Sequence, residues 1–472
     1  MAVRSLWRRV ETEEMGTGHP VRTLVIMALP AATAGILQTT FELVDMLFVS
    51  HLGKQQLSGV ALVTPVFMMV YALAMPVSVG ISALASRYLG ARRDEDARDV
   101  VNHGLIIAVI VGGLLTLFLP PLARQIVARL HGTGMILEYG TQFLSLILYA
   151  AVLGHVGMVA DAALRAQGNT ITPMRIMGVA NLANIALSGL FIFGLHWGVR
   201  GSAAATLVAR SGMVLVLLSR LWAPGSRLRP GRLPGRRLFG RWRLLADLYW
   251  IGLPPSLAMV AMSVSLVLIN QILIGLNPIA VGVQGIGWRI EMFAFVPVFG
   301  MFSALLPMVG YNFGAHQYRR CRETIRGAAL VAAAFMGAVG VLLFAFPGFF
   351  LRLFGNDPEV MTIGVNYLHI NSLSYALAGA SIMISAGFQA LGKSYLSMIC
   401  QLFRTLVVRY PTAYALAKVA GVVGVWWSTP ASTAATFLLT LVLMRSVFRG
   451  LGADAGALEA QPEAVAASVD SG

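Results

Sequence analysis

Residues 100–121 read VVNHGLIIAVIVGGLLTLFLPP, a run of 22 residues without a single Asp, Glu, Lys or Arg. A helix needs about 20 mostly apolar residues to cross the hydrocarbon core of a bilayer. The whole chain has the same character, because 57% of its 472 residues are hydrophobic and only 12% are charged. A soluble globular protein carries roughly 25% charged residues, so this composition excludes a water-soluble fold. The chain is predicted to be an all-α polytopic membrane protein.

Twelve mostly apolar runs follow one another along the chain, and we predict that each forms a transmembrane helix. An Arg-rich segment at residues 223–243 separates six of them from the other six. The predicted domains are a cytoplasmic N-terminal segment, a first six-helix bundle, a cytoplasmic linker, a second six-helix bundle and a disordered cytoplasmic tail. In that order they cover residues 1–21, 22–222, 223–243, 244–449 and 450–472. The predicted spans are approximately 22–49, 58–84, 100–121, 136–162, 172–195, 201–222, 246–275, 279–309, 328–351, 361–388, 396–419 and 424–447.

Basic side chains concentrate in alternate loops, and this sets the predicted orientation. Arg87, Arg92, Arg93 and Arg98 crowd one loop, whereas the loop before it holds Lys54. Short loops rich in Lys and Arg stay in the cytoplasm, so both chain ends are expected there, in agreement with an even number of spans. The same pattern accounts for the formal charge of +15, which would otherwise suggest a nucleic-acid partner. No apolar signal-peptide core precedes the first span, so we expect that span to remain in the protein.

Landmark residues recur at a constant offset, which indicates an internal repeat. Pro254 stands 224 residues after Pro30, and the Gly–Ala pairs at 90–91 and 314–315 and the glycines at 168 and 392 are separated by the same number. Each half has an even number of predicted spans, so the two bundles are expected to be related by a pseudo-two-fold axis along the membrane normal. Two such bundles around a central cavity can expose it alternately to either side, as in secondary transporters.

At these motifs the chain resembles the multidrug and toxic compound extrusion (MATE) family, most closely its bacterial branch with a carboxylate in the first span. The resemblance runs from about residue 22 to residue 448. The segments that carry it are LPAATAGILQTTFELVDMLFVSHLG, ASRYLGARRDEDAR, DAALRAQGNTITPMRIMGVANLANIAL, GIGWRIEMFAFVP and MVGYNFGAHQYRR.

The resemblance implies an antiporter of the bacterial inner membrane. Such a protein expels amphipathic, often cationic drugs and dyes in exchange for H⁺ or Na⁺ and needs no cofactor besides the coupling ion. We therefore expect partners among such small molecules and the lipid bilayer, no nucleic acid, no enzymatic activity, and a monomer.

The first span carries two acidic residues, and an ionisable group inside a span is a functional candidate because it is expensive to bury. Asp45 is expected in the outer half of the membrane, and Glu42 lies three residues earlier on the same helix face. Two carboxylates that close in a low-dielectric setting cannot both ionise cheaply, so we expect them to titrate as a coupled pair. A carboxyl that exchanges its proton when water reaches it is suited to H⁺ coupling.

In related proteins the first-span aspartate shares a cation site with side chains of spans five and six. The resemblance places these on Asn184 and Thr206, while Ser188 stands where relatives carry a second aspartate. A hard cation favours several oxygen ligands with more negative charge, so the serine favours H⁺ over Na⁺. Na⁺ at the Asp45 site is the alternative. The offset of 224 carries Asp45 to Ile269, so we expect coupling to reside in the first half.

The second half offers a tentative substrate cavity around span eight. Arg289 and Glu291 are two residues apart, so their side chains project in opposite directions. Glu291 is expected to meet a cationic substrate, to bind a proton, or to pair with Arg404 of span eleven. Met262 takes the approximate position of a span-seven acid in another branch of the family, and as a flexible apolar side chain it suits an adaptable cavity.

Pro30 interrupts the same span that carries Asp45. A proline inside a helix removes one backbone hydrogen bond and kinks the helix. We hypothesise that Pro30 is a hinge whose bend changes when Asp45 is protonated.

The alternative function is a flippase for lipid-linked precursors, because such proteins share duplicated bundles. A flippase for pyrophosphate-linked lipids requires several cationic groups in its cavity. The sequence places mainly Arg289 there, together with acidic residues, which favours a cationic cargo. A channel ranks below both, because it needs neither a coupling carboxylate nor kinked duplicate halves.

Overall fold

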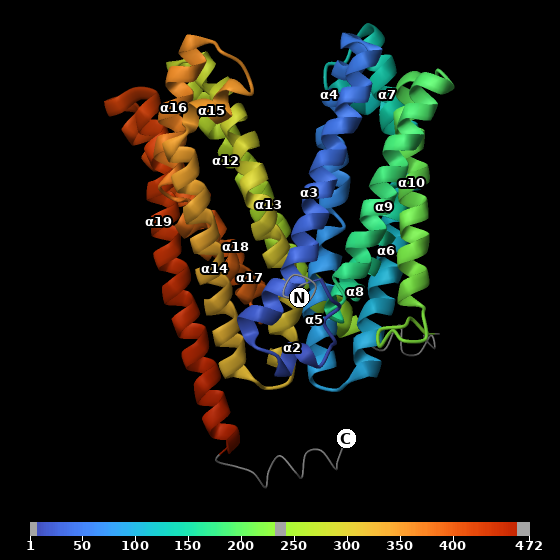
Figure 1. The fold of residues 1–472 in the computed structure, drawn as a ribbon, viewed down its shortest axis with the longest axis vertical. Helices are drawn as coiled ribbons and strands as arrows, with labels where there is room; N and C mark the ends of the chain where they lie inside the picture. The colour runs from blue at the N-terminus through green and yellow to red at the C-terminus, as the bar shows by residue number, and fades with distance from the viewer. Residues whose placement is uncertain (1–6, 232–241, 460–472) are drawn as a thin grey trace. The chain divides into compact units, whose positions relative to one another are not determined.

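The computed structural model describes residues 7–231 and 242–459, and within them the chain is helical almost throughout (Figure 1). Part of the predicted linker, at 232–241, and most of the predicted tail, at 460–472, lie outside the described residues. The first half contains α2 (Glu14–Thr17), α3 (Pro20–Leu52), α4 (Lys54–Ala72), α5 (Met75–Gly90), α6 (Asp94–Arg129), α7 (Gly134–Tyr149), α8 (Ala151–Ala166), α9 (Ile171–Gly189), the π-helix η1 (Leu190–Gly194) and α10 (Gly198–Leu221). The second half contains α12 (Trp242–Leu276), α13 (Pro278–Gly314), α14 (Tyr318–Ala345), α15 (Pro347–Arg352), α16 (Pro358–Ser372), α17 (Tyr375–Ala390), α18 (Ser394–Leu402), the π-helix η2 (Phe403–Arg409) and α19 (Tyr410–Glu459).

The apolar helices match the predicted spans. By length and composition, nine stretches of the described chain can each cross a membrane, and two bent helix pairs raise the number to eleven. The pairs are α7 with α8, bent by 47°, and α16 with α17, bent by 52°. The stretch Ser394–Leu451 is 58 residues long and contains both of the last two predicted spans, with a break at Gly421 where φ is 57°. Every predicted span therefore has a helical counterpart.

One predicted span boundary is wrong. The ninth span was expected at 328–351, but α14 ends at Ala345 and α15 begins at Pro347. Proline has no N–H to donate and its fixed φ suits the first turn of a helix, so Pro347 starts a new helix and does not extend the old one. The predicted tail begins at residue 450, and α19 continues through its first part to Glu459. Alanine, leucine and glutamate are good helix formers, and they dominate residues 451–459.

The internal repeat is confirmed by the backbone. Arg92 and His316, which are 224 residues apart, both have positive φ, at 59° and 57°. Gly168 and Gly392 share the same offset and have φ of 83° and 74°. The two bent pairs also break at equivalent places, near residues 150 and 374. Arg92 and His316 are different residue types, yet both adopt the left-handed backbone conformation. The two halves therefore share local structure at matched positions.

The chain divides into two compact units. Unit 1 comprises Met1–Leu257, Phe293–Ala315 and Gln389–Ser394, and unit 2 comprises Ala258–Met292, His316–Phe388 and Tyr395–Gly472. Parts of α12 and α13 therefore pack with the first-half helices. Their glycines allow this: a Cβ on Gly252 would lie 1.8 Å from the carbonyl oxygen of Pro76, and one on Gly300 would lie 2.5 Å from the backbone nitrogen of Ala32. The predicted division at residues 223–243 separates the two halves of the sequence and differs from the division into these units. The predicted domain boundaries stay a prediction.

The described parts of the N-terminal segment and of the linker pack on unit 1. The Thr12 hydroxyl donates to the carbonyl of Gln167 at 2.9 Å, and the Asn312 amide donates to the carbonyl of Met15 at 3.0 Å. From the linker, Arg227 forms an ion pair with Asp94 at 2.8 Å. The start of the linker is thus held by specific polar contacts with the protein.

Candidate functional site

The first candidate site lies in unit 1, where α3, α9 and α10 pack against one another (Figure 1). Asp45 on α3 accepts a hydrogen bond from the Ser202 hydroxyl of α10 at 3.0 Å. On the neighbouring helices, the Ser188 hydroxyl donates to Asn184 Oδ1 at 3.0 Å, and Asn184 Nδ2 donates to Thr206 Oγ1 at 3.2 Å. The Ser188 hydroxyl also lies within reach of the Asp45 carboxylate. We call these five residues the Asp45 cluster.

Helical spacing explains why these side chains meet. Asn184 and Ser188 are four residues apart on α9, and Ser202 and Thr206 are four apart on α10, so each pair shares one helix face. All four are buried, and Ser202 is fully shielded from solvent. Buried polar side chains are stable only when hydrogen-bonded, and here they satisfy one another and the half-buried carboxylate. The structure therefore brings together four of the five residues predicted for the cation site.

The fifth, Glu42, has a different environment. It is exposed on α3, and its carboxylate accepts a hydrogen bond from Gln38 at 2.9 Å. The predicted coupling between Glu42 and Asp45 stays a prediction, and the nearest polar partners of Asp45 in the structure are the serines.

Sequence reasoning missed two residues of this site, Ser202 and Arg210. They form a stripe with Thr206 on one face of α10, at four-residue intervals, and that spacing was the signal available. The positive charge of Arg210 is close enough to interact with Asp45. Its guanidinium donates a hydrogen bond to the Tyr71 hydroxyl and lies 5.1 Å from the centre of the Tyr71 ring.

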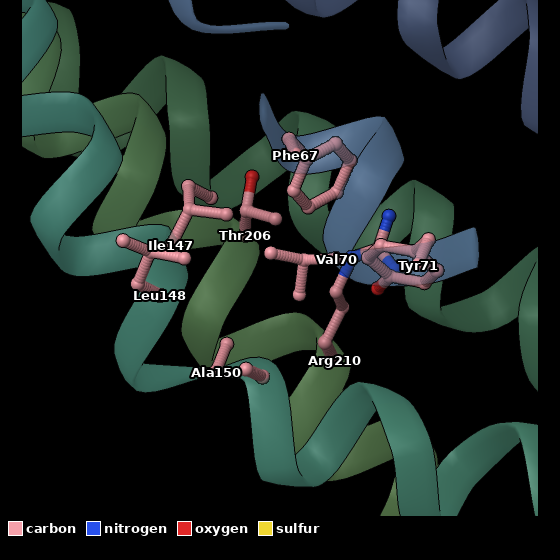
Figure 2. A pocket seen from close by; sticks show the side chains of 9 residues that line it. Phe67, Val70, Tyr71, Ile147, Leu148, Ala150, Thr206 and Arg210 are labelled. Atoms are coloured by element: carbon pink, nitrogen blue, oxygen red, sulfur yellow. The ribbon is translucent and has the colours of Figure 1, made fainter. Parts of the chain in front are cut away.

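A small pocket adjoins the Asp45 cluster, with Thr206 common to both (Figure 2). Figure 2 shows Arg210 extending towards Tyr71, on the other side of Val70 from Thr206. The free space of the pocket is close to that of one water molecule. A water molecule there could carry a proton next to the Asp45 cluster. The pocket is lined by Phe67, Val70, Tyr71, Ile147, Leu148, Ala150, Ala151, Thr206 and Arg210.

The Asp45 cluster offers oxygen atoms and one negative charge. A carboxylate, an amide oxygen and three hydroxyls suit a proton or a small monovalent cation. Among the described residues there is no group of three His, Cys, Asp or Glu side chains that could hold a metal ion.

The second candidate site lies in unit 2 around Glu291 of α13. The hydroxyls of Tyr367 and Tyr375 each donate to Glu291 Oε1 at 3.0 Å, and the Asn371 amide donates to the same oxygen at 3.5 Å. The expected partner, Arg404, interacts with Glu291 only through charge, and no ion pair between them occurs among the described side chains. Two tyrosines and an asparagine take the place of the predicted arginine.

The other two residues of the predicted substrate cavity are on exposed positions of unit 2. Arg289 is exposed on α13, as expected for a side chain opposite to Glu291. Met262 on α12 is 39% exposed. Their role in binding a substrate stays a prediction.

Comparison with known proteins agrees with this architecture. The model of the MatE family matches the chain twice, at residues 30–190 and 254–415, which is more than half of its length. The chain belongs to the MATE family. The two matches begin at Pro30 and Pro254, the first pair of landmarks of the repeat. Members of this family are transporters, so the protein is a multi-pass membrane transporter and not an enzyme.

Several relatives are similar over nearly their whole length. The probable multidrug resistance protein NorM of Thermotoga maritima is 26% identical over 415 residues, 86% of this chain and 88% of that protein. The FAD transporter of Shewanella oneidensis is 26% identical over 427 residues, 87% of this chain and 91% of that protein.

Solved structures confirm the fold class. A MATE transporter in the bent conformation is 26% identical, has a TM-score of 0.88, and is matched over 95% of this chain and 100% of that chain. A transporter from Pyrococcus furiosus whose structure is described as having a binding pocket of reverse polarity is 26% identical, with a TM-score of 0.87 over 94% of this chain and 99% of that chain. The chain has the MATE fold of twelve helices in two bundles.

Proposed function

We propose that this protein is a multidrug efflux antiporter that exports amphipathic, often cationic compounds in exchange for H⁺ by alternating access. The observation that carries the proposal is Asp45, a lone carboxylate held by buried hydroxyl and amide groups within one unit. The relatives described as multidrug resistance and export proteins support the cargo class. We further propose an inner-membrane location with both termini cytoplasmic, on the distribution of basic loops, and a monomeric state.

Exchange follows from charge competition at Asp45. The ionised carboxylate attracts a cation and also faces the positive charge of Arg210. A proton on Asp45 removes that negative charge, so a proton and a cationic cargo do not gain from binding at the same time. Since Arg210 also lines the pocket and bonds Tyr71, the protonation state of Asp45 changes the electrostatics of the pocket beside it. Mutually exclusive binding is the requirement for antiport.

The cluster favours H⁺ over Na⁺ for two reasons. It holds one carboxylate, because Ser188 stands where relatives carry a second aspartate. Its hydroxyl and amide protons are already directed at neighbouring oxygens, so several of these hydrogen bonds would have to break before the oxygens could turn to a metal ion.

Dye efflux from everted vesicles tests the proposal. Ethidium efflux is measured under an imposed pH gradient and, separately, under an imposed Na⁺ gradient. We expect the pH gradient to drive efflux in the wild type and not in Asp45→Asn, which keeps an acceptor for Ser202 but cannot exchange a proton. Efflux driven only by Na⁺ would contradict H⁺ coupling, and no ethidium efflux under either gradient would contradict the proposed function.

Two further variants sharpen the result. Glu138→Gln is the matched control, because Glu138 is also exposed on a unit 1 helix and hydrogen-bonded to a glutamine four residues away. It should transport like the wild type. Glu42→Gln tests the predicted coupled pair: a loss comparable to that of Asp45→Asn supports a shared role for the two carboxylates.

A flippase for lipid-linked precursors is the second candidate, and one observation favours it. Arg404 and Arg409 place two positive charges close together near Glu291, which the sequence reasoning had not combined. Movement of a fluorescent lipid pyrophosphate across proteoliposomes, without ethidium efflux under either gradient, would favour the flippase.

A further inference from the structure

Two arginines of unit 2 form no hydrogen bond and no ion pair with the part of the chain that the structure describes. Arg404 and Arg409 lie in the π-helix η2, and the Nε atoms of both are buried without a hydrogen bond. Among the described residues neither guanidinium forms a hydrogen bond or an ion pair. Of the carboxylates in the described ranges, Glu291 alone interacts with them, and three side chains already donate to it.

Both arginines are half-buried, and the buried Nε donor of each is unsatisfied. A buried donor without an acceptor is costly, so a ligand or water that accepts from these atoms would stabilise the arrangement. The two guanidiniums also repel each other, because their charges interact directly. Single π-helical turns inside α-helices frequently occur at functional sites, and this one places side chains five residues apart on nearly the same face.

A third donor lies in the same region. The indole Nε1 of Trp426 is buried without a hydrogen bond, and its ring packs edge-on against Tyr367 at 4.9 Å between centroids. Since Tyr367 donates to Glu291, the tryptophan adjoins the Glu291 site. Asn371 contributes one buried oxygen, Oδ1, that accepts no hydrogen bond. The group thus combines three donors in need of an acceptor, and we call Arg404, Arg409 and Trp426 the arginine subsite.

The arginine subsite is a specific feature of the second half. At the offset of 224, Arg404 corresponds to Ala180, Arg409 to Ile185 and Glu291 to Phe67. The repeated fold is therefore stable with apolar residues at these positions. Packing alone does not require two arginines, so a role in ligand binding explains them better.

We propose that the arginine subsite binds the anionic group, phosphate or carboxylate, of an aromatic amphipathic cargo. Guanidinium groups form strong, charge-assisted hydrogen bonds with these anions, and their flat faces also stack on aromatic rings. The inference rests on the proposed export function and extends its cargo from cations to anionic and zwitterionic compounds. Cations are handled by the Asp45 cluster of unit 1 and anionic groups by the arginine subsite of unit 2.

Flavin mononucleotide and riboflavin form a matched pair of probes, because they share one ring system and differ by the phosphate. The quenching of flavin fluorescence is titrated with the full-length protein in phosphatidylcholine nanodiscs, without any ion gradient. We expect flavin mononucleotide to bind at least about tenfold more tightly than riboflavin, the loss typical for one charge-assisted hydrogen bond. Equal affinity of the two flavins would overturn the proposal.

Three variants give effects of opposite sign. Arg404→Gln and Arg409→Gln should each weaken binding of flavin mononucleotide about tenfold and leave riboflavin unchanged. Glu291→Gln removes the competing negative charge but keeps an oxygen for the tyrosine hydroxyls, so it should strengthen binding of flavin mononucleotide. A general loss of fold would instead weaken the binding of both flavins in every variant. If Glu291→Gln folds, as judged by a monodisperse elution profile, and weakens the phosphate-bearing flavin selectively, the proposal is wrong.

A lipid headgroup could supply the same anionic chemistry. Nanodiscs with added phosphatidylglycerol distinguish the sources: competition with flavin mononucleotide that disappears in Arg404→Gln assigns the site to a phospholipid, and absence of competition assigns it to a soluble anion. Both outcomes support anion binding. The assay needs no transport, so failure of pH-driven ethidium efflux and failure of flavin binding are separate results.

Discussion

At the scale of single residues, the account depends on the hydrogen bond between Ser202 and Asp45. The Ser202 hydroxyl donates to this carboxylate at 3.0 Å, and the bond joins α10 to α3. In the proposed mechanism, a serine that holds the carboxylate fixes the position at which the proton would be exchanged. The residue therefore acts through Asp45 as a positioning residue.

Replacing Ser202 by alanine should slow pH-driven ethidium efflux by about tenfold, because a hydrogen bond to a charged group contributes about 1.5–3 kcal/mol. Ser211→Ala is the control, since the Ser211 hydroxyl bonds only to the carbonyl of Leu207 in its own helix. Initial efflux rates at equal protein density measure the effect. Equal rates in Ser202→Ala and the wild type would show that the hydrogen bond has no role in transport.

The site was predictable as far as helix periodicity and family resemblance reach. The resemblance to the MATE family placed Asn184, Ser188 and Thr206 in this site, and the structure brings them to Asp45. Glu42 shows the limit of helix periodicity. A spacing of three residues places Glu42 and Asp45 on the same face of α3, but Glu42 contacts Gln38 and Asp45 contacts Ser202. Ser202 was overlooked because a small hydroxyl among alanines carries no composition signal.

At the scale of elements, the central helix is α3, in which the buried Pro30 precedes Asp45, the proposed coupling carboxylate, by 15 residues. Pro30 leaves one backbone carbonyl without its helical donor, so the helix bends more easily there. The hinge hypothesis requires that this bend follows the protonation of Asp45.

Pro30→Ala should restore the missing backbone hydrogen bond, stiffen α3 and slow ethidium efflux several-fold. Pro65→Ala is the control, because Pro65 also lies inside a helix, α4, but on an exposed position away from the Asp45 cluster. Efflux rates of both variants are measured under the same pH gradient. If Pro30→Ala transports as fast as Pro65→Ala, Pro30 is not a hinge.

A pH-sensitive contact holds the short element α2. Arg8 forms an ion pair with Glu14, and this hydrogen bond holds the pKa of the Glu14 carboxyl below its ordinary value of 4.5. A depressed pKa in the folded state means that the stabilisation is complete above pH 4.5 and is lost as the pH falls through the folded value.

Hydrogen exchange of residues 12–17 should therefore accelerate as the pH is lowered below 4.5, after correction for intrinsic exchange. Glu14→Gln should already show the faster exchange at pH 7. Glu11→Gln should not, because the Glu11 carboxylate forms no ion pair with the described side chains. Exchange in the wild type that is as fast at pH 7 as in Glu14→Gln would show that the ion pair contributes nothing.

At the scale of the whole molecule, the internal repeat determines the architecture. The two proposed binding sites lie where the side chains of the two halves differ. The offset of 224 predicted the fold because duplicated halves keep the same turns, and Arg92 with His316 shows that even positive φ values are kept. Side chains have diverged: an acidic site stands in one half and an arginine subsite in the other. The second was not predictable, because η2 places Arg404 and Arg409 together through a π-helical turn that a 3.6-residue period does not reveal.

The central claim is that dye and proton exchange through Asp45, and the most direct measurement is proton counterflow in proteoliposomes. An ethidium gradient is imposed with equal pH on both sides and no Na⁺, and the internal pH is followed with a trapped indicator. We predict a pH change opposite in direction to the dye flux in the wild type, its absence in Asp45→Asn, and no effect of added Na⁺. Dye movement without a pH change, or only in the presence of Na⁺, would contradict the account.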